Sequence, residues 1–136
     1  MSLSVAAAFQ APLLAPTLYA HRLVRTLRVA ALASNDPTID PQTRLIALLG
    51  TAEAASVFRL LHAGMAHVWP DPLTVFPPCC LRLTHDEANF LAMVAYAANN
   101  DRRGFDHQIG EMIGEDARDW LFLTTARFVA VCQSTP

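Results

Sequence analysis

The chain has 136 residues, of which 53% are apolar and 16% are charged, and its formal net charge is −2. This length is the usual size of one domain, and such a chain buries roughly two thirds of the surface that it exposes when unfolded. The low net charge excludes a general electrostatic attraction to nucleic acid or to anionic membranes. All ten basic residues are arginine, which excludes chemistry that needs a lysine amine, such as Schiff base formation.

Typical domains are about 45–50% apolar and about 25% charged, so this chain has more apolar surface than a small domain easily hides. Either the core is unusually tight and rich in alanine, or a partner covers part of the surface. A second copy of the same chain is the simplest partner. We therefore expect a homodimer.

The N-terminal segment, residues 1–16, is apolar but has no basic residue, and Gln10, Pro12 and Pro16 interrupt its apolar run. A secretory signal would need a basic region ahead of the apolar stretch, so we expect an irregular arm instead. No stretch reaches the roughly 18–20 apolar residues of a membrane-spanning helix. The three cysteines, without an export signal, favour reduced thiols. We expect a cytoplasmic protein.

Thr17 to Ser34 has the pattern of an amphipathic helix, with a good N-cap residue and apolar side chains on one side. The opposite side carries Arg22, Arg25 and Arg28, three residues apart. These arginines could contact phosphate, but a solvated or salt-bridged helix face is the alternative that we favour.

Asp40 as N-cap and Pro41 at the first helical position predict a short second helix, which Gly50 ends after Leu49. Thr51 can cap a third helix, which runs to about residue 69, where proline follows. The two helices and their short turn have the outline of a helix-turn-helix, but the second offers too few exposed polar groups to read base edges. DNA binding is the third and weakest of our functional hypotheses.

Residues 70–83 contain four closely spaced prolines and predict an extended connector. The sequences LTVF and CLRL within it could also pair as two short strands. Next, Thr84 and Glu87 form the S/T-x-x-E pattern of a capping box and predict a helix from Thr84 to Ala98. Asp86 and Glu87 in its first turn are favoured by the helix dipole.

Two further helices are expected, a short one over residues 105–114 and a long one over about residues 116–132 that is apolar nearly all round. The long helix belongs in the centre of a bundle or in a subunit interface, with Trp120, Phe122 and Phe128 as its candidate anchors. The chain is thus expected to be a single all-α domain, a compact bundle of five to six helices with a proline-rich connector in the middle.

The segment PPCCLRLTHDE holds two adjacent thiols and a histidine, Cys79, Cys80 and His85, which are ligand types for zinc or another soft divalent metal. Adjacent cysteines point in divergent directions, whereas zinc sites usually separate them by two to four residues. A redox-active thiol pair is a second hypothesis, although a vicinal disulfide is strained. We favour a third interpretation, in which the thiols end the connector and the next residues start a helix, so no cofactor is expected.

Residues 101–119 concentrate carboxylates, and His107, Glu111 and Glu115 are spaced so that they would share one face of a continuous helix. Such a face could chelate a divalent ion or bind a basic surface, including the arginine side of the first helix. A solvated acidic face is the simpler interpretation.

Around the cysteines, the chain resembles an uncharacterised family of small helical bacterial proteins that carry a Pro-Cys-Cys segment before a Thr-x-Asp-Glu helix start. The resemblance covers about residues 22–93, and the matching positions are Pro78, Cys79, Cys80, Thr84, Asp86 and Glu87. It implies no activity and transfers no catalytic residue.

No catalytic motif is present, so the principal hypothesis is a non-enzymatic helical interaction or regulatory module that acts as a homodimer, with another protein partner also conceivable. The alternative is a metal- or thiol-dependent protein centred on Cys79, Cys80 and His85.

Overall fold

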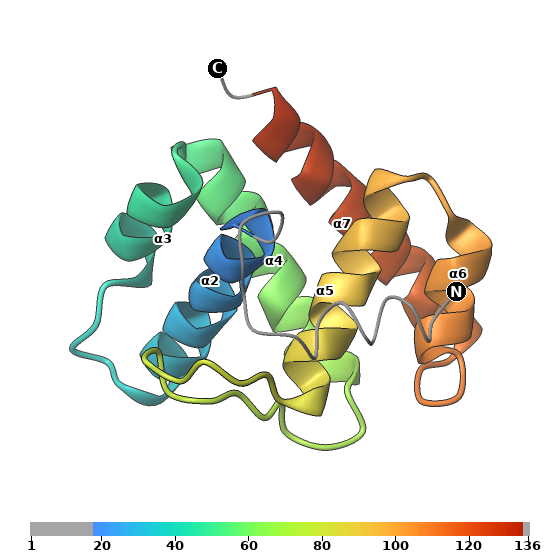
Figure 1. Cartoon of the computed structure of the whole chain (residues 1–136), viewed down its shortest axis with the longest axis horizontal. Coiled ribbons are helices and arrows are strands. Elements are labelled where there is room, and N and C mark those ends of the chain that lie inside the picture. The colour runs from blue at the N-terminus through green and yellow to red at the C-terminus, as the bar shows by residue number, and fades with distance from the viewer. Residues whose placement is uncertain (1–17, 135–136) are drawn as a thin grey trace.

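In the computed structural model, which describes residues 18–134, the chain is an all-α bundle (Figure 1). The predicted N-terminal arm and the Thr17 cap lie outside these residues. Six helices occur in the described part: α2 (Leu18–Asn35), α3 (Pro41–Leu49), α4 (Ala52–Val68), α5 (His85–Ala98), α6 (Arg102–Ile109) and α7 (Glu115–Gln133). No strand occurs in residues 18–134, so the connector between α4 and α5 contains no hairpin.

The predicted start and stop signals of α3 and α4 are confirmed. The Asp40 side chain accepts a hydrogen bond from the Gln42 backbone N–H, and Gly50 ends α3 in the left-handed region with φ of 96°. Thr51 accepts from the Ala54 backbone N–H and begins α4. A proline at the first helical position and a left-handed glycine after the last turn are the two local features that confine α3 to nine residues.

The predicted short helix after α5 is shifted towards the N-terminus. It was expected over residues 105–114 but runs from Arg102 to Ile109 as α6. Asp101 causes the earlier start, because its side chain accepts from the Gly104 backbone N–H as an N-cap. α7 then starts at Glu115, after Gly114 as N-cap.

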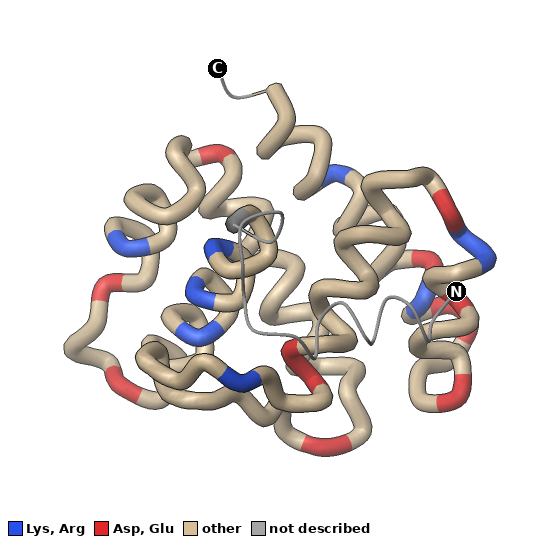
Figure 2. Tube along the Cα trace, viewed as in Figure 1, with Lys and Arg blue, Asp and Glu red and all other residues tan. Residues whose placement is uncertain are grey.

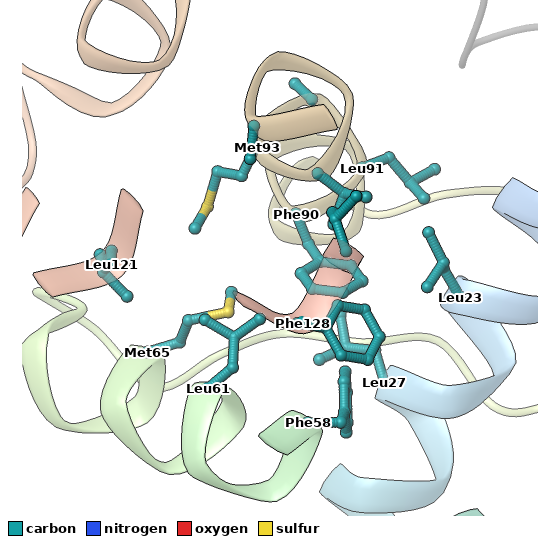
Figure 3. Packing of buried hydrophobic residues seen from close by; sticks show 14 of the residues in the cluster. Leu23, Leu27, Phe58, Leu61, Met65, Phe90, Leu91, Met93, Leu121 and Phe128 are labelled. Carbon is teal, nitrogen blue, oxygen red and sulfur yellow. The ribbon is translucent and has the colours of Figure 1, made fainter. Parts of the chain in front are cut away.

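Aromatic side chains from three helices meet at the centre of the core. Phe58 of α4 lies with its ring centroid 5.9 Å from that of Phe90 of α5 and 5.5 Å from that of Phe128 of α7, and all three are fully buried. Figure 3 shows them surrounded by leucine and methionine side chains from α2, α4, α5 and α7. Burying a phenylalanine contributes about 1.5–3 kcal/mol, so this cluster contributes several kcal/mol to the packing of α4, α5 and α7 against one another.

No single helix among residues 18–134 combines the length and hydropathy of a membrane span. Only α3 and α4 taken together meet that test, by length and composition, and they are bent by 116° at their junction.

Candidate functional site

A buried ion pair between α2 and α5 makes more hydrogen bonds than any other pair of side chains in the described residues. Arg28 and Glu87 have side chains only 2% and 0% exposed. The Arg28 Nε donates to Glu87 Oε2 at 2.6 Å, and the Arg28 Nη2 donates to Glu87 Oε1 at 3.0 Å. This two-pronged geometry is the strongest form of arginine–carboxylate contact. The hydrogen bond to Glu87, partly opposed by desolvation, raises the pKa of Arg28 above its usual value.

The remaining donors of Arg28 bind the connector. Its Nη1 donates to the backbone carbonyls of Pro77 at 3.2 Å and Cys80 at 2.7 Å, and its Nη2 donates to that of Arg82 at 2.7 Å. Figure 1 shows the connector, in yellow-green, passing close to α2 before it enters α5. A proline-rich segment without regular structure leaves its carbonyls unpaired, and one guanidinium satisfies three of them here.

Glu87 binds the connector from the other side while it caps α5. The predicted capping box is confirmed, because Glu87 Oε1 accepts from the Thr84 N–H at 2.9 Å and Thr84 Oγ1 accepts from the Glu87 N–H at 3.0 Å. Glu87 Oε2 also accepts from the Phe76 N–H at 3.2 Å. A residue that sequence reasoning assigned to helix capping alone therefore also neutralises a buried charge and holds the loop.

Asp86 forms a second set of contacts at the other end of the connector. Its Oδ1 accepts from the Trp69 Nε1–H at 3.0 Å, and its Oδ2 accepts from the Thr74 N–H at 2.8 Å. Thr84 Oγ1 in turn donates to the Thr74 carbonyl at 2.7 Å. The N-cap and first turn of α5 thus bind the connector at several points and fix its path.

The predicted metal ligands are not gathered into a metal site. Cys79 is exposed, Cys80 is half-buried and both are free thiols, while His85 is exposed at the start of α5. Within residues 18–134, no three histidine, cysteine, aspartate or glutamate side chains lie together as a metal site requires. The Cys80 N–H donates to the Pro77 carbonyl at 3.0 Å, so the two thiols stand on a tight turn.

The third cysteine lies apart from this turn, near the C-terminal end of α7. The Cys132 thiol lies near the Tyr19 hydroxyl of α2, and burial raises the pKa of Cys132. Burial, with a smaller contribution from Cys132, raises the pKa of Tyr19 to about 12. Both groups therefore stay protonated near neutral pH, which is typical of a structural contact and not of a reactive thiol.

The predicted arginine row is divided by the fold. Arg22 and Arg25 are exposed on α2, whereas Arg28 is buried and committed to Glu87. The expected salt-bridged state is thus confirmed for Arg28. Figure 2 shows the basic positions along α2 and the acidic start of α5 beside the connector. The row leaves only two cations for phosphate contact.

The predicted acidic face does not form a continuous helix face. His107 lies on α6, Glu111 follows its end, and Glu115 begins α7. Asp106 in this region pairs locally, because its Oδ1 accepts from Arg102 Nε at 2.9 Å and from Arg118 Nε at 3.3 Å.

Arg102 also binds Asp119, and the hydrogen bond to Asp106 is the main cause of its raised pKa. Arg118 Nη1 donates to the Ile113 carbonyl at 2.7 Å. No ion pair between the acidic segment and the arginines of α2 occurs in the described residues, so the intramolecular charge match that the sequence left open does not form there.

Of the three aromatic residues proposed as interface anchors, only Trp120 reaches the surface. Phe128 is in the central core, and Phe122 is 9% exposed, with its ring 5.1 Å from that of Phe105 and the Arg102 guanidinium over it. The two phenylalanines therefore stabilise the fold. They do not lie on the surface, where interface anchors were expected.

Trp120 belongs to an exposed apolar surface between α4 and α7. Leu60, Trp120 and Leu123 are 47%, 39% and 67% exposed. Trp120 and Leu60 line a shallow hollow of about 400 Å³ whose other walls are Ala63, Gly64, His67, Val68 and Ala117. We call these eight residues, Leu123 included, the α4–α7 face.

Gly64 sets the position of the Trp120 ring. A Cβ atom at residue 64 would lie 2.1 Å from the Trp120 Cζ3 atom, so the indole rests directly on the backbone of α4. Because Phe58 contacts Phe128 and Gly64 contacts Trp120, the two helices run in opposite directions. A glycine in a helix costs about 1 kcal/mol relative to alanine, and here it allows a close approach.

A second hollow lies between α2 and α4 around His62. Spaces of about 220 and 440 Å³ share Ser34 and His62 in their walls. The imidazole stacks on Phe58 with the ring centroids 6.2 Å apart, and burial lowers the pKa of His62.

Sequence reasoning missed Arg28 as the organiser of the connector, and it missed Leu60, Gly64 and Leu123. A signal for two of these was present, since Leu123 lies one turn beyond Trp120 and Gly64 is the lone glycine of the third helix. No protein-family model, curated protein or solved structure matches the chain, so function is inferred from its own residues. The resemblance to the Pro-Cys-Cys family therefore stays a prediction.

Proposed function

We propose that the protein is a non-enzymatic helical interaction module that forms a homodimer in the cytoplasm, with the α4–α7 face as the interface. The observation that carries the proposal is that Leu60 and Trp120 line one hollow between neighbouring helices, with the exposed Leu123 one turn beyond Trp120 on α7. Large exposed apolar side chains that are contiguous, and not scattered singly, are typical of protein–protein interfaces.

The position of Trp120 favours a specific interface over a nonspecific apolar surface. Its ring is supported by Gly64 and is thus fixed before a partner arrives. Tryptophan is among the residues that most often dominate binding energy, and an anchor that is already ordered loses less entropy on binding. The hollow beside it offers a place for an apolar side chain of the partner.

The charges along α7 favour a second copy of this chain as the partner. Asp119 lies four residues before Leu123 and Arg127 lies four residues after it, so the three share one side of the helix. Two copies of α7 packed antiparallel about Leu123 would place each Arg127 opposite the partner's Asp119. Such self-complementarity is what a two-fold symmetric interface requires.

Asp119 can take part although it already binds Arg102, because its side chain remains 53% exposed. Arg127 and Leu123 are exposed as well. Charge pairs at the edge of an interface fix register and orientation more than they add affinity. The affinity is therefore expected to come from Trp120, Leu123 and Leu60.

Sedimentation velocity of the full chain over a range of concentrations tests the proposal. We expect a concentration-dependent dimer that becomes monomeric in Leu123→Asp. Leu81→Asp is the matched control, because Leu81 is 73% exposed but lies on the connector and is not one of the eight residues of this face. A dimer that survives Leu123→Asp would place the interface elsewhere.

Charge reversal provides a sharper test of the antiparallel arrangement. Arg127→Asp and Asp119→Arg are each expected to weaken the dimer, and the double variant is expected to restore it in part. If the double variant is as weak as the sum of the single variants, the two positions do not meet across the interface.

A further inference from the structure

We propose that Cys79 and Cys80 form a two-thiol binding site for a soft, thiol-seeking centre that needs only two sulfur ligands, such as a monosubstituted arsenic(III) compound. The site lies on the connector, apart from the α4–α7 face, and it is independent of dimer formation. Both thiols are free, and Cys79 is exposed while Cys80 is half-buried.

The turn that carries the thiols has no regular secondary structure, but several hydrogen bonds hold it in place. The Cys80 N–H donates to the Pro77 carbonyl, which closes a four-residue turn with Pro78 at its second position. Proline fixes φ there and preorganises such a turn. Arg28 also holds both ends of the turn, because it donates hydrogen bonds to the carbonyls of Pro77 and Cys80.

Glu87 in turn holds Arg28 in place. The turn is therefore tied, through Arg28, to a buried residue of α5. The Arg28 guanidinium makes five hydrogen bonds in total, two of them to Glu87. A preorganised pair of ligands binds more tightly than a flexible pair, because less entropy is lost on binding.

The spacing of the two cysteines decides which kind of ligand fits. Adjacent Cα atoms in a trans peptide lie about 3.8 Å apart, below the roughly 4.4–6.8 Å of an unstrained disulfide. Direct oxidation to a vicinal disulfide therefore stores strain. One bridging arsenic atom enlarges the ring, and its two bonds to sulfur let the thiols lie further apart than in a disulfide, which suits side chains that diverge from adjacent positions. A tetrahedral metal would need further donors, and no group of three suitable side chains is present in residues 18–134.

The reaction with a monosubstituted arsenic(III) oxide is balanced without an oxidant. Two arsenic–sulfur bonds form, the arsenic–oxygen bonds break, and the two thiol protons leave with that oxygen as one water molecule. Arsenic and sulfur keep their oxidation states. The product is a cyclic dithioarsenite on the turn.

Native mass spectrometry with phenylarsine oxide, on protein reduced with a phosphine, tests the proposal. We expect one phenylarsenic adduct per chain, which an excess of a 1,2-dithiol removes and an equal excess of a monothiol does not. Cys79→Ser and Cys80→Ser should each abolish this monothiol-resistant adduct. Cys132→Ser is the matched control and should keep it.

Circular dichroism of each variant confirms that the helices are retained, which is expected because Cys79 is exposed and Cys80 is only half-buried. An adduct that persists in Cys79→Ser or Cys80→Ser, or one that Cys132→Ser removes, would overturn the proposal. The absence of a monothiol-resistant adduct on the wild-type chain would overturn it as well.

Discussion

Arg28 and Glu87 lie 59 residues apart in the chain and form a fully buried, two-pronged ion pair that joins α2 to α5. The pair is also the anchor of the connector, since Arg28 binds three of its carbonyls and Glu87 binds one of its N–H groups. Every donor of Arg28 and both carboxylate oxygens of Glu87 have hydrogen-bond partners. These hydrogen bonds offset the free-energy cost of removing the two charges from water.

Arg28→Met is expected to lower the free energy of unfolding by about 3–5 kcal/mol, because it leaves the Glu87 charge buried without its partner. Urea denaturation measures the loss. Arg25→Met is the matched control on the same helix, since Arg25 is exposed, and it should change stability by less than about 0.5 kcal/mol.

A double-mutant cycle separates the ion pair from the packing around it. Arg28→Met combined with Glu87→Met should be less destabilising than the sum of the two single changes, since no uncompensated charge remains. Strictly additive losses would show that the two side chains act independently.

Thr84→Ala is expected to cost about 1–2 kcal/mol, the upper part of the range for an N-cap. Thr84 Oγ1 caps α5 and also donates to the Thr74 carbonyl, so two hydrogen bonds are lost. Thr51→Ala is the matched control, because Thr51 caps α4 without a contact to the connector. Equal losses in a thermal or urea unfolding experiment would contradict the extra role of Thr84.

Gly64→Ala is expected to push the Trp120 ring off α4, since the new Cβ would lie within 2.1 Å of the indole. The indole N–H resonance of Trp120 should shift in an NMR spectrum, while that of Trp69, held by Asp86, should stay. Gly114→Ala is the control, because nothing lies within 4 Å of a Cβ at that position. An unmoved Trp120 signal would show that the ring does not rest on Gly64.

Stability should fall as the pH is lowered through the range in which His62 takes up a proton. Burial lowers the pKa of His62 below 6.5, so the unfolded chain binds this proton more tightly than the folded chain does. The contribution is fully present above about pH 6.5 and is progressively lost below it. Urea denaturation at several pH values should therefore show a steeper decline for the wild-type chain than for His62→Gln.

Local signals were enough to predict most of the helices. The all-α class and the bounds of α3, together with the capping box of α5, follow from caps, prolines and a helix-ending glycine, which act within a few residues of where they stand. The bounds of α6 were missed because an aspartate N-cap at residue 101 competed with the apolar pattern that suggested a later start.

The candidate sites could be predicted only in part, because they depend on contacts between distant residues. The periodicity of α2 places Arg28 on the polar, exposed face of the helix. Only the fold shows that Arg28 is buried and binds one carboxylate and three backbone carbonyls. Likewise, the aromatic content of α7 indicates interface anchors, but which rings are buried depends on the position of α4 and α6.

The oligomeric state of the full chain at micromolar concentration, measured by light scattering coupled to size-exclusion chromatography, tests the proposed function most directly. We expect a mass of twice the 14.9 kDa of one chain for the wild type and for Leu81→Asp, and the mass of a single chain for Leu123→Asp. A wild-type protein that remains monomeric throughout the micromolar range would contradict it.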